Sequence, residues 1–390
     1  PTNPSIALDT TAQFVATGTY SDSSTQDLSS RVTWSSTEPA VGGVSNASGS
    51  KGLVTALTSS LLDNVTTVLL IVPVTLVITE ELEVPPYPFL FAQILCSNIG
   101  GTATLIGDPP NILIGSQVEG LGFTDFLVHL APAALVVLIA TFVPIWLIWG
   151  RRLHASPEAR ARVMAFRASD AITDRPLLVK CLVVISLVIL GFVVGHGYGL
   201  EPATVALTGG ALLMLLSNLG RKIDEKNDRV HQFFGNVEWT TIFFFVGVFV
   251  VVAGIERAGI LAKVSDLIVD GAGGDRNTIT IAVLWVSAIA SAVVDNIPFV
   301  ATMIPTLKGV VAELQLSPES AQPMWWALSL GACLGGNGSL IGASANLIVA
   351  GFAERAKQPI RFFAFLKHAF PMMLMSIAIA HLYIWLRYLA

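Results

Sequence analysis

The chain has 390 residues, of which 53% are hydrophobic and only 13% are charged, and its formal net charge is −5. Soluble domains carry about 25% charged residues, so this composition is typical of a membrane protein and not of a soluble enzyme. The acidic balance argues against a nucleic-acid partner. The three cysteines lie in apolar surroundings, and no metal-ligand spacing joins them, so we interpret them as small packing residues; they are Cys96, Cys181 and Cys333.

The first 57 residues differ from the rest because they are polar and rich in Ser and Thr. Alternating patterns predict short strands over 12–20, 31–36 and 52–57, separated by turn residues such as those at 21–27. Together with VTWSS around Trp34 and VSNASGSKGLVTA at 44–56, this segment resembles the start of a bacterial immunoglobulin-like module of group 2. We therefore expect a partial β module over residues 1–57.

The remainder of the chain contains apolar runs long enough to cross a bilayer. They cover residues 127–149, 177–196, 202–219, 237–256 and 370–389. This pattern predicts a mainly α, polytopic membrane domain over residues 58–390, in contact with membrane lipid, and a bacterial inner membrane as its location.

A duplication runs through this membrane domain. SSLLDNVTTVLLIVP (59–73) recurs as SAVVDNIPFVATMIP (291–305), and GGTATLIGDPPNILIG (100–115) recurs as GGNGSLIGASANLIVA (335–350). A third pair is FLVHLAP (126–132) and FLKHAFP (365–371). Repeated blocks broken by Gly and Pro in an apolar chain indicate a secondary transporter. We place repeat one at 58–149, connecting spans at 150–236 and repeat two at 237–390.

The loops 150–176 and 220–236 are rich in Arg and Lys, which marks both as cytoplasmic. Counting outward from them, segment 87–118 runs from inside to outside and segment 322–352 from outside to inside. The two repeats are therefore inverted, provided that 55–80 and 277–311 are re-entrant hairpins with their polar Asp-Asn pairs at the tips.

Each repeat thus contributes a hairpin tip and a broken helix. A break exposes carbonyl oxygens, which suit sodium together with Asp, Asn and Thr oxygens, whereas a carboxylate suits a proton. The amide end of a half-helix suits an anion. The predicted ion and substrate site comprises Asp63, Asn64, Thr66, Gly107, Asp108 and Asn111 from repeat one, and Asp295, Asn296, Gly342, Ser344 and Asn346 from repeat two. Sodium is assigned to Asp63, Asn64, Asp295 and Asn296.

Structural roles compete with these functional ones. The pairs Gly100-Gly101 and Gly335-Gly336 equally suit close packing of helices. Asn111 and Asn346 also suit caps of broken helix ends, a role that is compatible with binding. The repeats differ at the break, because Asp108 of repeat one is matched by Ala343 of repeat two. We interpret this as one ion or proton site with Asp63 and Asp108, and a second with Asp295.

The segments LLDNVTTVLLIVP and CSNIGGTATLIGDPPNILIGS closely resemble the ion transporter superfamily. The most similar branch comprises arsenite permeases, the melanosomal P protein and type D sodium/proton antiporters, in the citrate-transporter-like group. The resemblance covers about residues 56–390. It implies two inverted repeats around a midplane site, and transport of a small inorganic ion or anion. It implies no cofactor beyond a coupling sodium ion or proton, and it leaves a homodimer open.

Repeat one departs from this pattern at its start. The counterpart of the arm 277–294 would be 45–62, which includes SNASGSKGLV. We therefore infer a junction near residues 52–58 and expect repeat one to lack its first spans and most of its hairpin arm. The tip residues Asp63 and Asn64 would then lose partners, so this chain alone is predicted to be impaired in transport.

Two functions from different classes remain in view. The first is a secondary active transporter working by alternating access. The alternative is a membrane-anchored surface module in which residues 1–57 bind a partner and the spans only anchor it. The Asp-Asn tips and the GDPPN break favour the transporter, because an anchor needs neither. An enzyme is not expected, since the sequence carries no HExxH or other catalytic arrangement.

Overall fold

A computed structural model of the chain describes residues 17–19, 25–27, 50–150, 153–165, 174–195, 198–220, 222–235, 237 and 239–390. The chain forms two units, residues 1–39 and 40–390. The described part of the first unit is an antiparallel strand pair, β1 (Thr17–Thr19) and β2 (Thr25–Asp27). β1 lies inside the strand predicted over 12–20, β2 lies where a turn is predicted, and the strand predicted over 31–36 falls outside the described residues.

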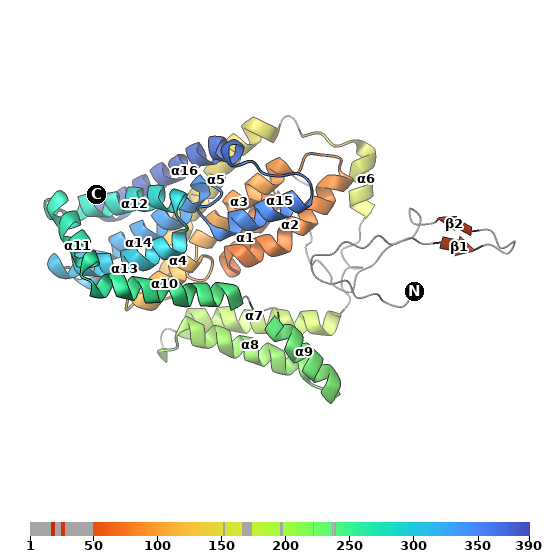
Figure 1. Cartoon of the computed structure of the whole chain (residues 1–390), viewed down its shortest axis with the longest axis horizontal. Helices are drawn as coiled ribbons and strands as arrows, with labels where there is room; N and C mark the ends of the chain where they lie inside the picture. Colours follow the sequence, from red (N-terminus) through yellow and green to blue (C-terminus); the bar gives the residue numbers. More distant parts are fainter. Residues whose placement is uncertain are drawn as a thin grey trace. The chain divides into compact units, whose positions relative to one another are not determined.

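The second unit is helical, and its two repeats have the same order of elements (Figure 1). Repeat one consists of α1 (Ser50–Leu61), α2 (Asn64–Glu81), α3 (Tyr87–Thr102), α4 (Pro109–Gln117) and α5 (Phe123–Trp149). The corresponding elements of repeat two are α12 (Arg276–Val293), α13 (Asn296–Glu313), α14 (Pro318–Gly335), α15 (Ser344–Arg355) and α16 (Phe362–Ile384). Two short turns, η4 (Gly336–Gly338) and the π-helical η5 (Trp385–Leu389), follow α14 and α16.

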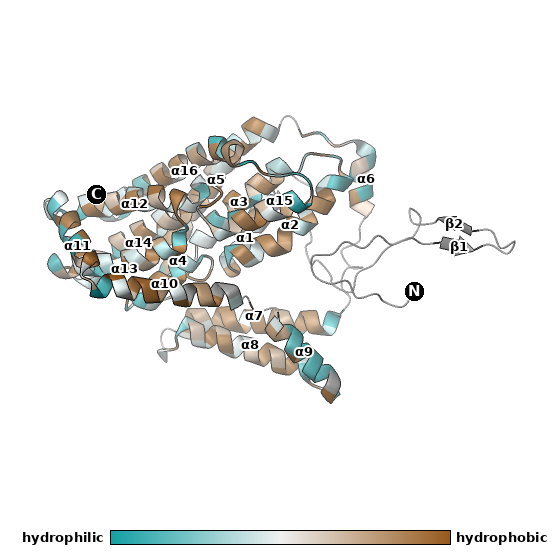
Figure 2. Ribbon diagram, viewed as in Figure 1, coloured by the Kyte–Doolittle hydropathy of each residue, from teal (hydrophilic) through white to brown (hydrophobic). Residues whose placement is uncertain are grey.

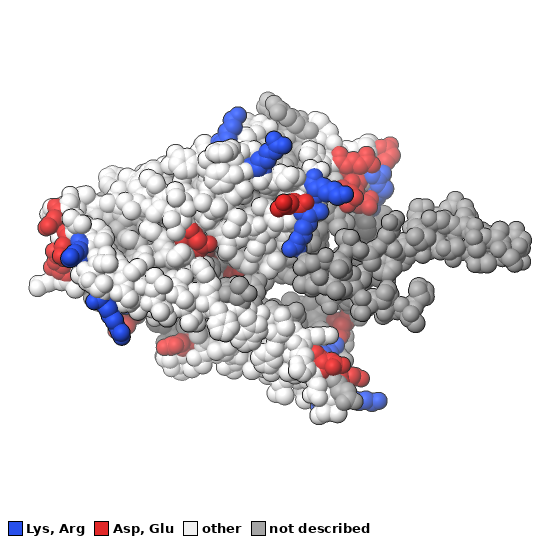
Figure 3. All heavy atoms as spheres, in the orientation of Figure 1, with Lys and Arg blue, Asp and Glu red and all other residues white. Residues whose placement is uncertain are grey.

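The connecting elements are α6 (Pro157–Ala165), α7 (Arg175–Gly195), α8 (Pro202–Asn218) and α9 (Ile223–Gly235), and two further helices, α10 (Trp239–Arg257) and α11 (Ile260–Gly271), precede α12. Helices α7, α8 and α10 are largely hydrophobic, whereas α9 is largely hydrophilic (Figure 2). Charged side chains are sparse on the face drawn in Figure 3. Both features are those of a protein surrounded by lipid.

Among the described residues, five helices are long and apolar enough to cross a membrane, or six if α10 and α11, bent by 69°, count as one span. Helices α5, α7 and α16 with η5 confirm three of the predicted runs, while α8 is shorter, at 17 residues. α2 and α12 are also long and apolar enough to cross a membrane. Each forms one arm of a hairpin, and the other arms, α1 beside α2 and α13 beside α12, do not meet this criterion. The mainly α, polytopic fold is confirmed.

The two repeats are inverted, as the equivalent helices α5 and α16 show. Near the start of α5, His129 Nδ1 lies 2.6 Å from the hydroxyl of Tyr388 at the end of the C-terminal helix. At the other end, the ring of Trp149, the last residue of α5, lies 5.1 Å from the ring of His368, close to the start of α16. The helices that carry the third repeated block therefore run antiparallel.

An ion pair places the open end of the first hairpin beside the basic loop. Arg162 of α6 lies 2.7 Å from Glu83 and 3.5 Å from Glu81, at the end of α2. The hydrogen bond with Glu83 raises the pKa of the Arg162 guanidinium. Since loop 150–176 is predicted to be cytoplasmic, the first hairpin opens toward that same side, as the topology requires.

The prediction of a strand over 52–57 is wrong, because these residues belong to helix α1. α1 packs along α3 through small residues, as α12 packs along α14. A Cβ on Gly100 would clash with the carbonyl of Ala56, and a Cβ on Gly335 would lie 2.6 Å from the Ala288 backbone. Ala56 and Ala288 are equivalent positions, so the close-packing interpretation of both glycines is confirmed.

The first hairpin arm is also more complete than expected. α1 has 12 residues and α12 has 18, so two thirds of the helix is present. A Cβ on Gly52 would lie 3.0 Å from Cys96 Sγ, and a Cβ on Gly331 would lie 2.5 Å from the Leu284 carbonyl oxygen. Gly52 is equivalent to Leu284 and Cys96 to Gly331, so each helix pair places one glycine opposite one larger residue. The expectation that most of the arm is lacking is wrong.

Candidate ion and substrate site

Asp63 forms the tip of the first hairpin and caps α2. Its carboxylate accepts hydrogen bonds from the backbone N–H of Thr66 at 2.8 Å and from the Thr66 hydroxyl at 2.5 Å. Asp is a favoured N-cap because its side chain satisfies an amide that the first helical turn leaves free. Asp63 is half-buried.

Asn64 joins this tip to the broken helix of its own repeat. Its backbone N–H donates to the Gly107 carbonyl at 3.0 Å, and its Nδ2 donates to Asn98 Oδ1 at 3.0 Å. The Oδ1 of Asn64 and the Oγ1 of Thr67, one helical turn further on, are buried without a hydrogen-bond partner. Two free oxygens at this spacing are suitable ligands for a hard cation. The expected loss of partners at the first tip is therefore limited to these oxygens, because the backbone N–H and the Nδ2 of Asn64 are both bonded.

Asn111 and Asn346 bind the carbonyl ends of the two broken helices. Asn111 Nδ2 donates to the carbonyls of Thr102 at 3.2 Å and Thr104 at 2.8 Å. Asn346 Nδ2 donates to the carbonyls of Gly336 and Ser339, both at 2.8 Å. Both side chains satisfy backbone groups that a break leaves free. The predicted capping role is confirmed, and a cation would have to share these carbonyls.

Gly107 and Gly342 lie at the breaks where no space remains for a side chain. A Cβ on Gly107 would lie 2.6 Å from the carbonyl oxygens of Gly101 and Ser59. A Cβ on Gly342 would lie 2.7 Å from those of Gly336 and Ser291. These neighbours are backbone atoms, so they cannot rotate away. Only glycine therefore allows each break to lie this close to the end of the hairpin arm before it, α1 in repeat one and α12 in repeat two.

Asp108 joins the break of repeat one to the tip of repeat two. It is fully buried, and its Oδ1 accepts a hydrogen bond from Asn296 Nδ2 at 3.3 Å. Its Oδ2 has no partner, and within the described residues it forms no ion pair. A buried carboxylate charge without a partner is costly, so Asp108 favours a bound proton or cation. The equivalent Ala343 offers no such group.

Asp295 and Ser344 occupy the second tip and the second break. Asp295 caps α13 by accepting a hydrogen bond from the Ile297 backbone N–H at 3.0 Å, and it is half-buried. Ser344 is the first residue of α15 and is also half-buried. The described residues hold no group of three or more His, Cys, Asp and Glu side chains that could bind a metal ion together. A sodium ion would therefore depend mainly on amide, hydroxyl and carbonyl oxygens.

The sequence reasoning missed the residues that join the two repeats. Asn98 Nδ2 donates to Asn337 Oδ1 and to Asn346 Oδ1, both at 2.9 Å. Across the same interface, the Ser329 hydroxyl donates to Asn111 Oδ1 at 2.5 Å. A usable signal was the presence of Asn98 and Asn337 as lone amides in apolar segments. The alignment of the repeats obscured it, because Asn98 falls on Cys333 and Asn337 on Thr102.

The helices around the site also exchange partners symmetrically: α2 of repeat one packs on α15 of repeat two, and α13 of repeat two packs on α4 of repeat one. Each hairpin therefore lies against the second half of the broken helix in the opposite repeat. The arrangement brings the Asp-Asn tips and the breaks to one central region. Asp63 is held within its own tip by Thr66, and Asp108 is the acid at the contact between repeats.

Two family matches agree with the division of the chain into a polar N-terminal segment and a membrane domain. Residues 44–331 match the citrate transporter family, and residues 1–61 match the bacterial immunoglobulin-like domain of group 2. The matches overlap between residues 44 and 61, the stretch that includes α1.

The curated relatives include proteins named as transporters and one named as a membrane protein. The chain is 42% identical over 336 residues to an uncharacterized transporter of Mycobacterium bovis, covering 86% of this chain and 76% of the relative. It is 39% identical over 339 residues to a 46 kDa membrane protein of Mycobacterium leprae, with the same coverage of 86% and 76%. It is 32% identical over 413 residues to the P protein of Homo sapiens, covering 85% of this chain and 48% of that protein. The chain belongs to the citrate transporter family.

Proposed function

We propose that this protein is a secondary active transporter that moves an ion or small anion by alternating access, coupled to sodium or protons. The observation that carries the proposal is Asp108, which is fully buried, has one oxygen without a partner and is hydrogen-bonded by Asn296 of the opposite repeat. Buried acids in a membrane domain are functional by default because their charge is costly there.

The geometry suggests how ion binding and movement are linked. A proton or cation at Asp108 removes the cost of its unpaired charge, which stabilises the arrangement in which Asn296 lies against it. When the ion leaves, the uncompensated charge favours an arrangement that exposes Asp108 to water. The hydrogen bond from Asn296, at the tip of repeat two, to Asp108, at the break of repeat one, would therefore form and break with each cycle, because the two residues belong to different repeats.

The two breaks favour different partners. α4 begins with Pro109 and Pro110, which have no N–H to offer, and Asp108 precedes them. α15 begins with Ser344 and Ala345, whose amides are available at the positive end of the helix. Repeat one thus suits a proton or cation, and repeat two suits the anionic cargo. The citrate named by the family description is the first cargo to test.

The proposal is tested by reconstituting the full chain in liposomes. We expect saturable uptake of labelled citrate, or sodium/proton exchange measured in parallel, driven by an imposed sodium or proton gradient. The variant Asp295→Asn is expected to reduce the rate at least about tenfold, the scale of one lost ion contact of about 1.4 kcal/mol or more. Gradient-driven flux no faster than in empty liposomes, for both cargoes, would contradict the proposal.

A further inference from the structure

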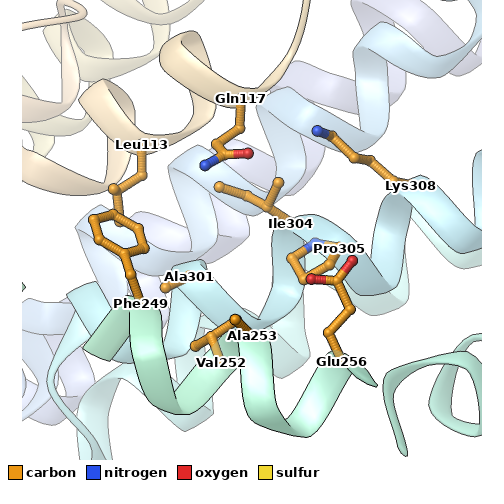
Figure 4. Close-up of a pocket in the computed structure, with 10 residues that line it drawn as sticks. All are labelled: Leu113, Gln117, Phe249, Val252, Ala253, Glu256, Ala301, Ile304, Pro305 and Lys308. Carbon is orange, nitrogen blue, oxygen red and sulfur yellow. The ribbon is translucent and has the colours of Figure 1, made fainter. Parts of the chain in front are cut away.

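A cavity of about 350 Å³ lies between α4, α10 and α13, outside the polar network described above. Its wall is mostly apolar and includes Leu113, Ala301 and Ile304. Three polar side chains line it as well, one from each helix: Gln117 of α4, Glu256 of α10 and Lys308 of α13. Figure 4 shows their polar ends turned toward the space between the three helices. An apolar pocket with a few converging polar groups is the usual form of a small-molecule site.

The cavity lies along a helix pair that begins at the central site. α4 starts directly after Asp108, α13 starts at Asn296, and these two residues are hydrogen-bonded. Lys308 is twelve residues beyond Asn296, or about 18 Å along the helix, and Gln117 is nine residues beyond Asp108, or about 14 Å. Ala301 is only about 8 Å beyond Asn296 by the same rise. The cavity therefore extends from the polar residues on its rim toward Asp108.

Two charged side chains of opposite sign lie on its rim, near the ends of α10 and α13. Lys308 and Glu256 are both exposed, and no ion pair joins them within the described residues. The helix α10 leaves the basic loop 220–236, which is predicted to be cytoplasmic, and Glu256 lies at its far end. The rim therefore lies toward the outer face.

A second cavity, of about 460 Å³, lies on the symmetry-equivalent helix pair, α2 of repeat one and α15 of repeat two. It is nearer the helix ends and is also lined by charges of both signs, among them Glu83, Arg355 and Lys357. Glu83 pairs with Arg162 of the basic loop, so this cavity lies toward the predicted cytoplasmic face. The inverted repeats thus place one cavity with a charged rim on each side of the central site.

We propose that the cavity between α4, α10 and α13 is the outer vestibule of the transport path, and that Lys308 and Glu256 set the charge preference of the small ions that enter it. This rests on the proposed transport function, which it extends by naming the route. Lys308 attracts anions into an otherwise apolar passage, and Glu256 opposes them and attracts cations. Gln117 offers an uncharged hydrogen-bonding group to either.

The test uses cysteine labelling in the full chain, whose own cysteines interfere little with it. Cys96 and Cys333 are buried, so only the half-buried Cys181 needs replacement by Ser. Ala301→Cys is introduced in that background, and its labelling is followed with two membrane-impermeant methanethiosulfonates, one bearing a sulfonate and one a trimethylammonium group. Leu135→Cys, on the exposed face of α5 and at a 56% exposed position, is the matched lipid-facing control.

We expect Ala301→Cys to react from the outer side, much faster than Leu135→Cys. The ratio of the anionic to the cationic labelling rate should fall about two- to fivefold with Lys308→Gln and rise by a similar factor with Glu256→Gln, as expected for one charge at short range in a wet site. Size-exclusion profiles of the purified variants show whether they are folded.

Three results would overturn the proposal: labelling no faster than in the Leu135→Cys control, labelling from the cytoplasmic side only, or a ratio unchanged by both charge substitutions. None of these depends on a known cargo. A protein that labels as expected but moves no cargo would separate failure of the transport proposal from failure of the vestibule.

Discussion

Asp108→Asn is expected to abolish ion-coupled accumulation of cargo while leaving downhill exchange of the same cargo in place. Asn is nearly the same size and can still bond to Asn296, but it cannot carry a titratable proton or a negative charge for a cation. The buried site then no longer distinguishes ion-bound from ion-free states. We expect accumulation against a gradient to fall at least about tenfold, the effect of losing about 1.4 kcal/mol of differential interaction. Gradient-driven uptake and exchange in the same liposomes measure both quantities.

Asp266→Asn is the matched control for this substitution. Asp266 is an exposed acid on α11, so its removal changes the net charge equally without touching the buried network. It should accumulate cargo as the unaltered chain does. If Asp108→Asn also accumulated cargo normally under both sodium and proton gradients, Asp108 would not be the coupling residue.

Gly100→Ala and Gly335→Ala are each expected to destabilise the fold strongly. A single methyl group on Gly100 would meet the Ala56 carbonyl, and one on Gly335 would lie 2.6 Å from the backbone of Ala288. Since the opposing atoms are backbone, the two helices would have to separate along their length. Overpacking typically costs about 1–3 kcal/mol, and these positions should be at or above the upper end. Thermal unfolding of the purified protein in detergent measures the loss.

Gly351→Ala provides the matched control in the same kind of element. Gly351 lies in α15, and a Cβ there would meet nothing within 4 Å. Alanine should raise stability by up to about 1 kcal/mol through its higher helix propensity. A similar gain of stability in all three variants would mean that helix propensity, and not contact between the hairpin arms and the broken helices, governs these positions.

The hairpin tips and the helix breaks were predictable from the sequence because their motifs occur in both repeats. Asp63 and Asp295, and Gly107 and Gly342, recur in register, and polar or helix-breaking residues in an apolar segment require a special environment. The joining contacts were not predictable in this way. Asn98 bonds to Asn337 and Asn346 across the interface, and a contact between repeats leaves no trace in the comparison of one repeat with the other.

The arm before the first tip was misjudged for a different reason. Residues 52–57 read GLVTAL, and a short apolar run cannot be assigned to helix or strand from periodicity alone. The packing of Gly52 and Ala56 against α3 decides in favour of helix. Local pattern favoured a strand continuing the polar segment, whereas tertiary contact with the membrane domain fixes the observed structure.

The most direct test of the coupling role of Asp108 follows cargo and coupling ion together in one preparation. Proteoliposomes receive labelled citrate on one side, while internal pH and labelled sodium report ion movement. We predict that cargo and one of the two ions move in a fixed ratio with the unaltered chain, and that Asp108→Asn moves cargo downhill without the ion. The same fixed ratio in Asp108→Asn would contradict the assignment of coupling to the buried acid between the two repeats.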